Sequence, residues 1–200
     1  MLLLLSCWMI AGVTAKDQPS LHYRVKNSSI CIQVEKSLRQ NTWLLNKKAI
    51  VLDKIITPRY KDKVDYDPIN HTLCINKLTE TDSGNYTFQF INSEDEQSEE
   101  IHRLIVQESV PRPVIRMSGL HSNLSAGQCN ITVKCSIRDE WVWSVCDEVS
   151  CITSEESLRE VNITIFTGNR SIVCSGNNHV STSNVSESTE AMCKYYVRIY

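Results

Sequence analysis

The chain has 200 residues, of which 42% are hydrophobic, and a formal net charge of -2. This length suits one large domain or two ordinary ones, and the hydrophobic content is sufficient for packed cores. A charge so close to neutral argues against nucleic acid as a partner.

The N-terminal residues 1–15 read MLLLLSCWMIAGVTA, an apolar run that ends in the small residues expected before a signal-peptidase site. The run is too short to cross a bilayer, although it lacks the Lys or Arg that usually opens a signal peptide. We therefore expect a signal peptide over 1–15 and an extracellular mature protein. We expect it to be secreted, or to be held at the cell surface by an anchor.

Cysteines and glycosylation sequons agree with export. Cys7 leaves with the signal peptide, so 9 − 1 = 8 cysteines remain, an even set that suits disulfides in an oxidising compartment. Eight Asn-x-Ser/Thr sequons predict a heavily glycosylated surface. The acceptor residues are Asn27, Asn70, Asn85, Asn123, Asn130, Asn162, Asn169 and Asn184.

From residue 21 to 106 the pattern predicts short strands and polar turns, with no sustained helical period. Ile30, Ile32 and Val34 alternate with polar residues and are expected to face inward, which leaves Cys31 facing outward. Trp43 begins the next strand and is the expected core tryptophan. A single strand is then predicted over 49–56, and a basic loop over 58–67.

The segment 73–90, LCINKLTETDSGNYTFQF, carries the strongest pattern of the chain. An Asp-Ser-Gly turn precedes Tyr86, after which Tyr86, Phe88 and Phe90 alternate with polar residues. An acidic hairpin tip over 94–100 and a last strand through Leu104 and Val106 follow. Strand, turn and tyrosine resemble the end of an immunoglobulin variable-type domain. That family has a cysteine two residues after the tyrosine, where this chain has Phe88.

A proline-containing connector, residues 108–113, leads to a second region that holds six of the mature cysteines. Pro111 and Pro113 predict a stiff, extended link. A variable-type domain without its disulfide, the Val-Pro-x-Pro-Val-Ile junction over 110–115 and a cysteine-rich second domain resemble the signalling lymphocyte activation molecule (SLAM) family. The resemblance is strongest to its small glycolipid-anchored two-domain member.

This resemblance implies an all-β protein of two tandem immunoglobulin-like β-sandwiches. The variable-type domain is expected over 16–108, a linker over 109–113 and a constant-type domain over 114–200. The resemblance also implies disulfides between Cys135 and Cys174 and between Cys129 and Cys193. The chain departs from the family pattern in two places. Ile172 replaces the tyrosine that the family has at this position of the second domain, and Cys146 and Cys151 have no counterpart in the family. We expect Cys146 and Cys151 to form a disulfide that closes a local loop.

In the first domain, loss of the inter-sheet bridge forgoes about 2–4 kcal/mol. Val34 and Phe88 packed against Trp43 can recover much of this, at about 1.5–3 kcal/mol for each buried apolar side chain. Cys31 and Cys74 remain, at outward positions of strands that neighbour each other in this fold. We expect a cross-strand disulfide there, and the alternative is two free thiols.

One outer sheet face of the first domain is the candidate binding surface. Its strands expose apolar and polar side chains flanked by charges of both signs, which is typical of a modest recognition face. The candidate residues are Leu44, Asn46, Lys48, Thr87, Gln89, Ile91, Glu94, Glu96, Ile101 and Arg103. In the SLAM family this face binds the matching face of another family member, homophilically or heterophilically. The alternative is that these charges form an ordinary solvated surface.

No sequence motif indicates a catalytic or metal-binding site. The five histidines lack metal-ligand spacing, and the sequence has no phosphate loop or nucleophile elbow, so we predict no catalytic residue, metal, cofactor or small-molecule substrate. Asp82 is expected to be a structural carboxylate at the turn. The predicted function is that of an immune adhesion or co-stimulatory ectodomain that binds an immunoglobulin-superfamily receptor on an apposed cell. The alternatives are a secreted decoy of such a receptor and a structural glycoprotein without a receptor partner.

Overall fold

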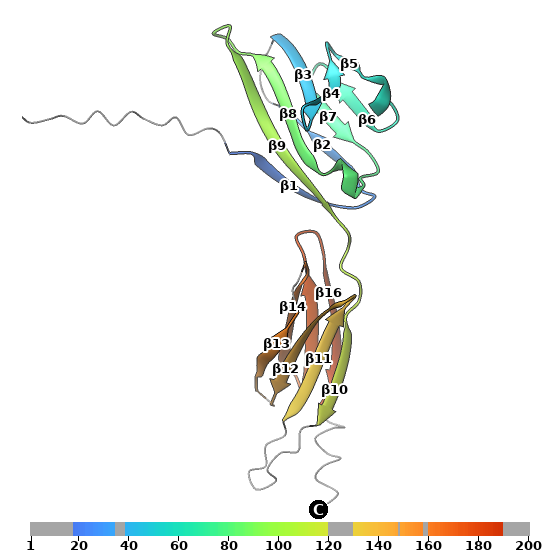
Figure 1. Cartoon of the computed structure of the whole chain (residues 1–200), viewed down its shortest axis with the longest axis vertical. Helices are drawn as coiled ribbons and strands as arrows, with labels where there is room; N and C mark the ends of the chain where they lie inside the picture. The colour runs from blue at the N-terminus through green and yellow to red at the C-terminus, as the bar shows by residue number, and fades with distance from the viewer. Residues whose placement is uncertain (1–17, 35–38, 120–129, 148, 158–159, 190–200) are drawn as a thin grey trace, which may run out of the picture. The chain divides into compact units, whose positions relative to one another are not determined.

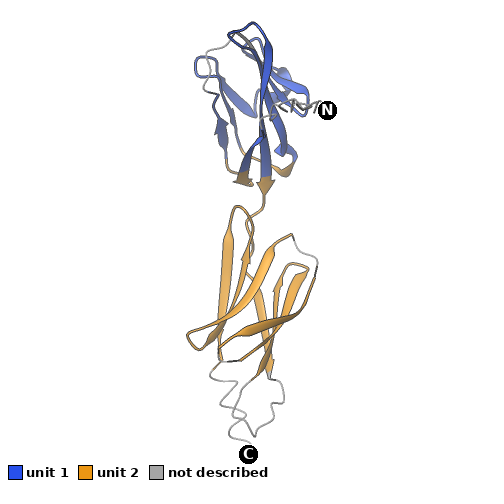
Figure 2. Cartoon of the chain, turned by 90° about the vertical axis from the view of Figure 1, so that its left-hand side faces the viewer, with its two compact units in different colours: residues 1–22, 29–76, 81–105 blue, residues 23–28, 77–80, 106–200 orange. Residues whose placement is uncertain are grey.

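The computed structural model describes residues 18–34, 39–119, 130–147, 149–157 and 160–189, whose regular secondary structure is almost entirely β-strand (Figure 1). The predicted all-β fold is confirmed. The chain divides into two compact units, shown in Figure 2. The first comprises residues 1–22, 29–76 and 81–105, and the second comprises 23–28, 77–80 and 106–200. Within the described ranges, no helix is long and apolar enough to cross a bilayer.

The N-terminal sandwich is built from two sheets whose strands are mainly antiparallel. The larger sheet has six strands in the order β1-β9-β8-β3-β4-β5, and the smaller has the order β2-β7-β6. A sheet with extra strands beyond the central three, paired with a smaller sheet, is the variable-type arrangement. The bounds are β1 Ser20–Val25, β2 Ile30–Ile32, β3 Arg39–Leu45, β4 Lys48–Leu52, β5 Ile55–Ile56, β6 Val64–Asp67, β7 Thr72–Ile75, β8 Gly84–Ile91 and β9 Gln97–Gln107.

Both sheets contribute to the buried core, as their alternating sequences predicted. Trp43 and Phe88 are fully buried, and their rings lie 5.0 Å apart. Val34 is also buried, on the chain that continues from β2. The aromatic residue at position 88 therefore occupies the interior site that a disulfide fills in the usual variable-type domain.

The predictions for residues 49–67 were partly wrong. The single strand expected over 49–56 is two strands, β4 and β5, separated by Asp53 and Lys54, which both have positive φ. The loop expected over 58–67 contains a 3-10 turn, η1 (Pro58–Tyr60), and strand β6. A two-residue turn without glycine or proline gives little sequence signal, so the break in the strand was not predicted.

The acidic hairpin tip is shorter than predicted. The reversal lies over residues 92–96, where the Asn92 side-chain oxygen accepts hydrogen bonds from the backbone N–H groups of Glu94 and Glu96. Strand β9 already begins at Gln97, so Glu99 and Glu100 are strand residues.

The described part of the C-terminal sandwich has seven strands in a four-stranded and a three-stranded sheet. Their orders are β10-β11-β12-β13 and β14-β15-β16. The four and three strands match a constant-type domain in number, but here strands consecutive in sequence share a sheet. The bounds are β10 Val114–Gly119, β11 Ile131–Ile137, β12 Glu140–Cys146, β13 Cys151–Glu156, β14 Asn162–Gly168, β15 Ser171–Asn177 and β16 Thr182–Ser188.

Three disulfides join described cysteines. Cys135 on β11 and Cys174 on β15 are both fully buried and connect the two sheets of the C-terminal sandwich. Cys31–Cys74 and Cys146–Cys151 each connect residues that lie directly opposite in paired strands. These are pairings expected from the sequence. The expected Cys129–Cys193 bridge lies outside the described residues.

The connector is anchored within the second unit. Val110 is buried among the core residues of that unit, which include Cys135 and Ile137. Its backbone N–H donates to the Ser181 hydroxyl (2.7 Å), and Asn178 Nδ2 donates to the carbonyl of Glu108 (2.8 Å). We infer that Asn178 and Ser181 hold the chain at the entrance of the second sandwich.

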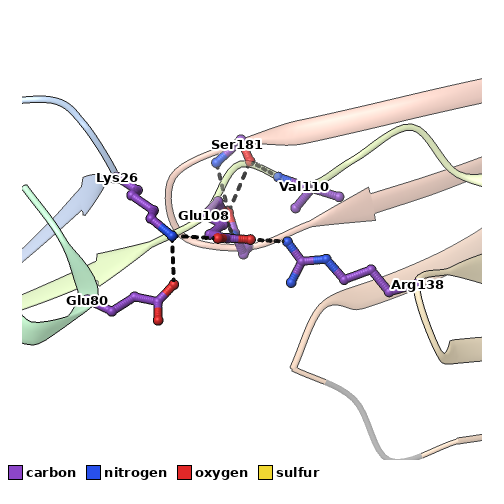
Figure 3. Close-up of polar contacts among 7 residues, drawn as sticks. Lys26, Glu80, Glu108, Val110, Arg138 and Ser181 are labelled. Atoms are coloured by element: carbon purple, nitrogen blue, oxygen red, sulfur yellow. Dashed lines mark hydrogen bonds and ion pairs between the residues drawn. The ribbon is translucent and has the colours of Figure 1, made fainter.

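Glu108 also forms the centre of a small ionic cluster in the second unit (Figure 3). Its carboxylate accepts from Lys26 Nζ at 2.8 Å and from the Arg138 guanidinium, while Lys26 contacts Glu80 at 3.4 Å. Hydrogen bonds from Lys26 and Arg138 lower the pKa of the Glu108 carboxyl, although all these groups are exposed to solvent. The cluster is consistent with a surface ion-pair network rather than a reaction centre.

Candidate partner-binding face

The candidate face is the outer side of β3, β4, β8 and β9 in the N-terminal sandwich. Along β8, Tyr86, Phe88 and Phe90 are buried, whereas Thr87, Gln89 and Ile91 between them are partly exposed. Successive side chains of a strand point to opposite sides of the sheet, so these three residues lie on the outer face.

The strand register brings the centre of the predicted face together. Thr87 lies opposite Leu44 of β3 on one side and opposite Ile101 of β9 on the other. All three side chains are partly exposed. They form a cross-strand row with two aliphatic side chains and a threonine methyl group, which can be buried against a partner.

Charged residues of both signs flank this row on β9. Glu99 and Arg103 are exposed and lie on either side of Ile101 in the outer-facing series of that strand. Glu99 is opposite Gln89, and Arg103 is opposite Asn85. An aliphatic centre with flanking opposite charges provides both burial and orientation for a protein partner.

Two predicted residues lie at the margin of the face. Asn46 belongs to the turn after β3 and has positive φ; its Oδ1 accepts a hydrogen bond from the Asn85 backbone N–H at 3.0 Å. Lys48 lies opposite Leu45, which in turn lies opposite the buried Tyr86. Lys48 therefore falls in the row of Leu45 and Tyr86, where it is exposed at the end of the sheet, and the outer-face neighbour of Leu44 is Ala49.

Glu94 and Glu96 are exposed in the hairpin reversal, close to the end of β8 at Ile91. Strand geometry places Ile91 about 20 Å from Asn85, at the opposite end of the same strand. The ten predicted residues thus extend over the whole length of the sheet face. The central part, Leu44, Thr87, Gln89 and Ile101, forms the compact group.

The sequence analysis missed two members of this face. Thr42 lies opposite both Gln89 and Leu52, so these three residues form a second cross-strand row beside the first. Leu52 is 52% exposed. Aligning β4 with β3 residue by residue could have identified this exposure. The bulge between Trp43 and Leu44 shifts the pairing of the two strands by one residue, and it was not predicted from the sequence.

The turn before β8 positions this strand. The Tyr86 hydroxyl donates to the carbonyl oxygen of Asp82 at 2.9 Å, and burial raises the pKa of that hydroxyl. The Asp82 carboxylate contacts Lys63 Nζ at 2.6 Å and is mostly buried. This geometry supports the structural role expected for Asp82.

Below the face, β9 carries a buried histidine. His102 Nδ1 lies 3.2 Å from His22 Nε2, and His102 Nε2 lies 3.1 Å from a Glu100 carboxylate oxygen. Burial is the main cause that lowers the pKa of His102, the Glu100 carboxylate opposes this effect, and His22 adds to it. No group of three or more potential metal ligands occurs among the described residues.

The sandwiches and their disulfides define the class of protein: a chain of tandem immunoglobulin-like domains. No protein-family model matches the chain. Among solved structures, murine CEACAM1b has a TM-score of 0.53 and 15% identity, covering 82% of this chain and 92% of that one. This likeness shows the fold alone.

The similar curated proteins narrow the class. SLAM family member 6 of Mus musculus is 30% identical over 135 residues, which cover 62% of this chain and 36% of that protein. T-lymphocyte surface antigen Ly-9 of Homo sapiens is 28% identical over 115 residues, 54% of this chain and 17% of Ly-9. CD48 antigen of Homo sapiens is 23% identical over 173 residues, 80% of this chain and 70% of CD48.

These proteins are SLAM-family immune receptors, so the resemblance to that family is confirmed. The chain spans well under half the length of Ly-9 and of SLAM family member 6. Its similarity to these proteins supports an immune receptor of the cell-surface kind.

Proposed function

We propose that the N-terminal sandwich binds the ectodomain of another SLAM-family receptor on an apposed immune cell, using the outer face of β3, β4, β8 and β9. The observation that carries this proposal is the row Leu44–Thr87–Ile101, which is partly exposed and lies between Glu99 and Arg103. The relatives are immune-cell surface receptors, which supports a partner of the same kind.

The face is small and rich in charge, so we expect weak and reversible contacts. Such contacts become effective when many copies act together on apposed membranes. Opposite charges at the margin mainly set the encounter rate and the choice of partner, while the aliphatic row supplies burial.

We also propose functional boundaries of 16–108 for the binding domain, 109–113 for the connector and 114–200 for the second domain, after a signal peptide over 1–15. The end of β9 at Gln107 and the start of β10 at Val114 support these boundaries.

The test is to tetramerise Lys16–Tyr200 and stain cells that each express one receptor of the family. Gln89→Arg places a bulky cation at the centre of the face and should abolish staining. Gln33→Arg is the matched control, because Gln33 is an exposed glutamine that follows β2 in the other sheet of the same sandwich. Equal staining by both variants would refute the proposed face.

Two further outcomes separate the alternatives. A homophilic mode predicts that cells expressing this chain bind its tetramer, whereas a heterophilic mode requires a different receptor. If a properly folded tetramer binds no receptor of the family, the proposed function is wrong and a structural glycoprotein is favoured.

A further inference from the structure

The C-terminal sandwich exposes a second, unassigned surface: the outer face of β10, β11, β12 and β13. Along β11, Ile131, Val133, Cys135 and Ile137 are buried, and the intervening residues are partly exposed. On β12 the same alternation turns Trp141, Trp143 and Val145 outward. Two tryptophans on the exposed side of a sheet are uncommon.

The register assembles these residues into one patch. Lys134 lies opposite Trp143, and its Nζ is 5.3 Å from the Trp141 ring centroid and 5.4 Å from that of Trp143. The ammonium therefore contacts both indoles in cation-π geometry. Arg116 of β10 is exposed and lies opposite Lys134 on the side away from Trp143, where it adds a second cation to the face.

Aliphatic residues extend the patch toward the far end of the sheet. Val145 lies between Thr132 and Ile152 in the neighbouring strands. Ile152 is 73% exposed. A contiguous face with two indoles and two aliphatic side chains is the kind of surface that a ligand or partner normally covers.

An N-glycosylation sequon lies on this same face. Asn130 directly precedes β11 and is partly exposed, and it continues the outward series of Thr132 and Lys134. Thr132 is the hydroxyl residue of that sequon, Asn130-Ile131-Thr132. Two residues along a strand correspond to about 7 Å and one strand spacing to about 4.8 Å, so the first sugars attach beside Val145.

We propose that the N-linked glycan carried by Asn130 lies along this face and covers Val145, Ile152 and the two tryptophans. Sugars have apolar C–H faces and polar hydroxyl edges, and the patch offers both complements. Its indole and aliphatic surfaces meet the C–H faces, while Lys134, Arg116 and Thr132 offer hydrogen bonds to hydroxyl groups.

A second copy of the chain, or another protein, is the competing occupant. Either would have to displace a bulky, solvated glycan that is attached at the edge of the patch. The attachment point on β11 therefore favours the protein's own glycan over a protein partner. The patch is distinct from the proposed receptor-binding face, since it belongs to the other sandwich.

Tryptophan accessibility tests the proposal. Removal of Trp8 with the signal peptide would leave 4 − 1 = 3 tryptophans, and Trp43 is fully buried. Acrylamide quenching of the mature protein from mammalian cells thus reports mainly on Trp141 and Trp143. We expect Asn130→Gln to raise the quenching constant and to shift the emission to longer wavelength.

Asn184→Gln is the matched control, because Asn184 is an exposed sequon residue on β16 of the other sheet. It should leave quenching unchanged. Native digestion with peptide-N-glycosidase repeats the test without a folding risk and should raise quenching in wild-type protein to the level of Asn130→Gln.

Three results would overturn the proposal. The first is glycopeptide mass mapping that finds Asn130 unmodified. The second is equal quenching before and after loss of its glycan. The third is a wild-type dimer whose tryptophans stay protected after deglycosylation, which would assign the face to a second copy.

Discussion

Replacement of Phe88 by alanine tests whether an aromatic side chain has taken over the stabilising role of the missing inter-sheet disulfide. Phe88 is fully buried and contacts three rings, with centroid distances of 5.0 Å to Trp43, 5.8 Å to Phe90 and 5.8 Å to His71. Truncation of such a side chain removes its transfer free energy and leaves a cavity, at a combined cost of about 3–5 kcal/mol.

This cost is a large part of the stability of a domain, which is about 5–15 kcal/mol. Guanidinium unfolding should be followed by amide exchange measured on peptides of the N-terminal sandwich, so that unfolding of the second sandwich does not interfere. We expect Phe88→Ala to lower the unfolding free energy of that sandwich by about 3–5 kcal/mol.

Phe166→Ala is the matched control, with amide exchange measured on peptides of the C-terminal sandwich that contains it. Phe166 is 48% exposed on β14, so the same chemical change leaves no closed cavity there. Its effect should remain below about 1 kcal/mol. If Phe88→Ala cost no more than this control, the aromatic replacement of the disulfide would be refuted.

Three other changes have defined outcomes. Joint replacement of Cys31 and Cys74 by serine opens a crosslink with a sequence separation of 43 and should cost about 4 kcal/mol in the chain-entropy model, measured by chemical unfolding. Tyr86→Phe removes the hydroxyl bond to the Asp82 carbonyl and should cost about 1 kcal/mol by the same measurement, while a neutral result would dismiss that bond as a stabilising contact. Burial lowers the pKa of His102, so the unfolded chain binds a proton at this residue more readily than the folded chain does. The unfolding free energy should therefore fall as the pH drops through about 6.5. His102→Gln should weaken this pH dependence, and an unchanged dependence would assign it to other groups.

Period-two alternation was enough to predict the core of the N-terminal sandwich. Ile30, Ile32, Trp43 and Phe88 are buried as expected, because each strand shows a clear contrast between its apolar and polar sides. The position of Tyr86 at the start of its strand was likewise predicted from the Asp-Ser-Gly turn that precedes it.

The register between neighbouring strands could not be predicted from the alternation of apolar and polar residues. The bulge beside Trp43 allows both Ile50 and Val51 to be buried and makes Ala49 the outer-face neighbour of Leu44. Lys48 consequently falls in the row of Leu45 and Tyr86. A register between two strands depends on turn geometry and bulges, and a one-residue shift changes which face each side chain occupies.

The anchoring of Val110 has a practical consequence for cutting the chain into fragments. A C-terminal fragment that starts at Val114 would lose a buried valine from its hydrophobic interior. It would also lose the backbone groups that bond to the Ser181 hydroxyl and to Asn178 Nδ2. A fragment that starts ahead of Glu108 retains all three contacts. The segment before the second sandwich is therefore part of what a recombinant fragment needs in order to fold stably, even though it forms no strand itself.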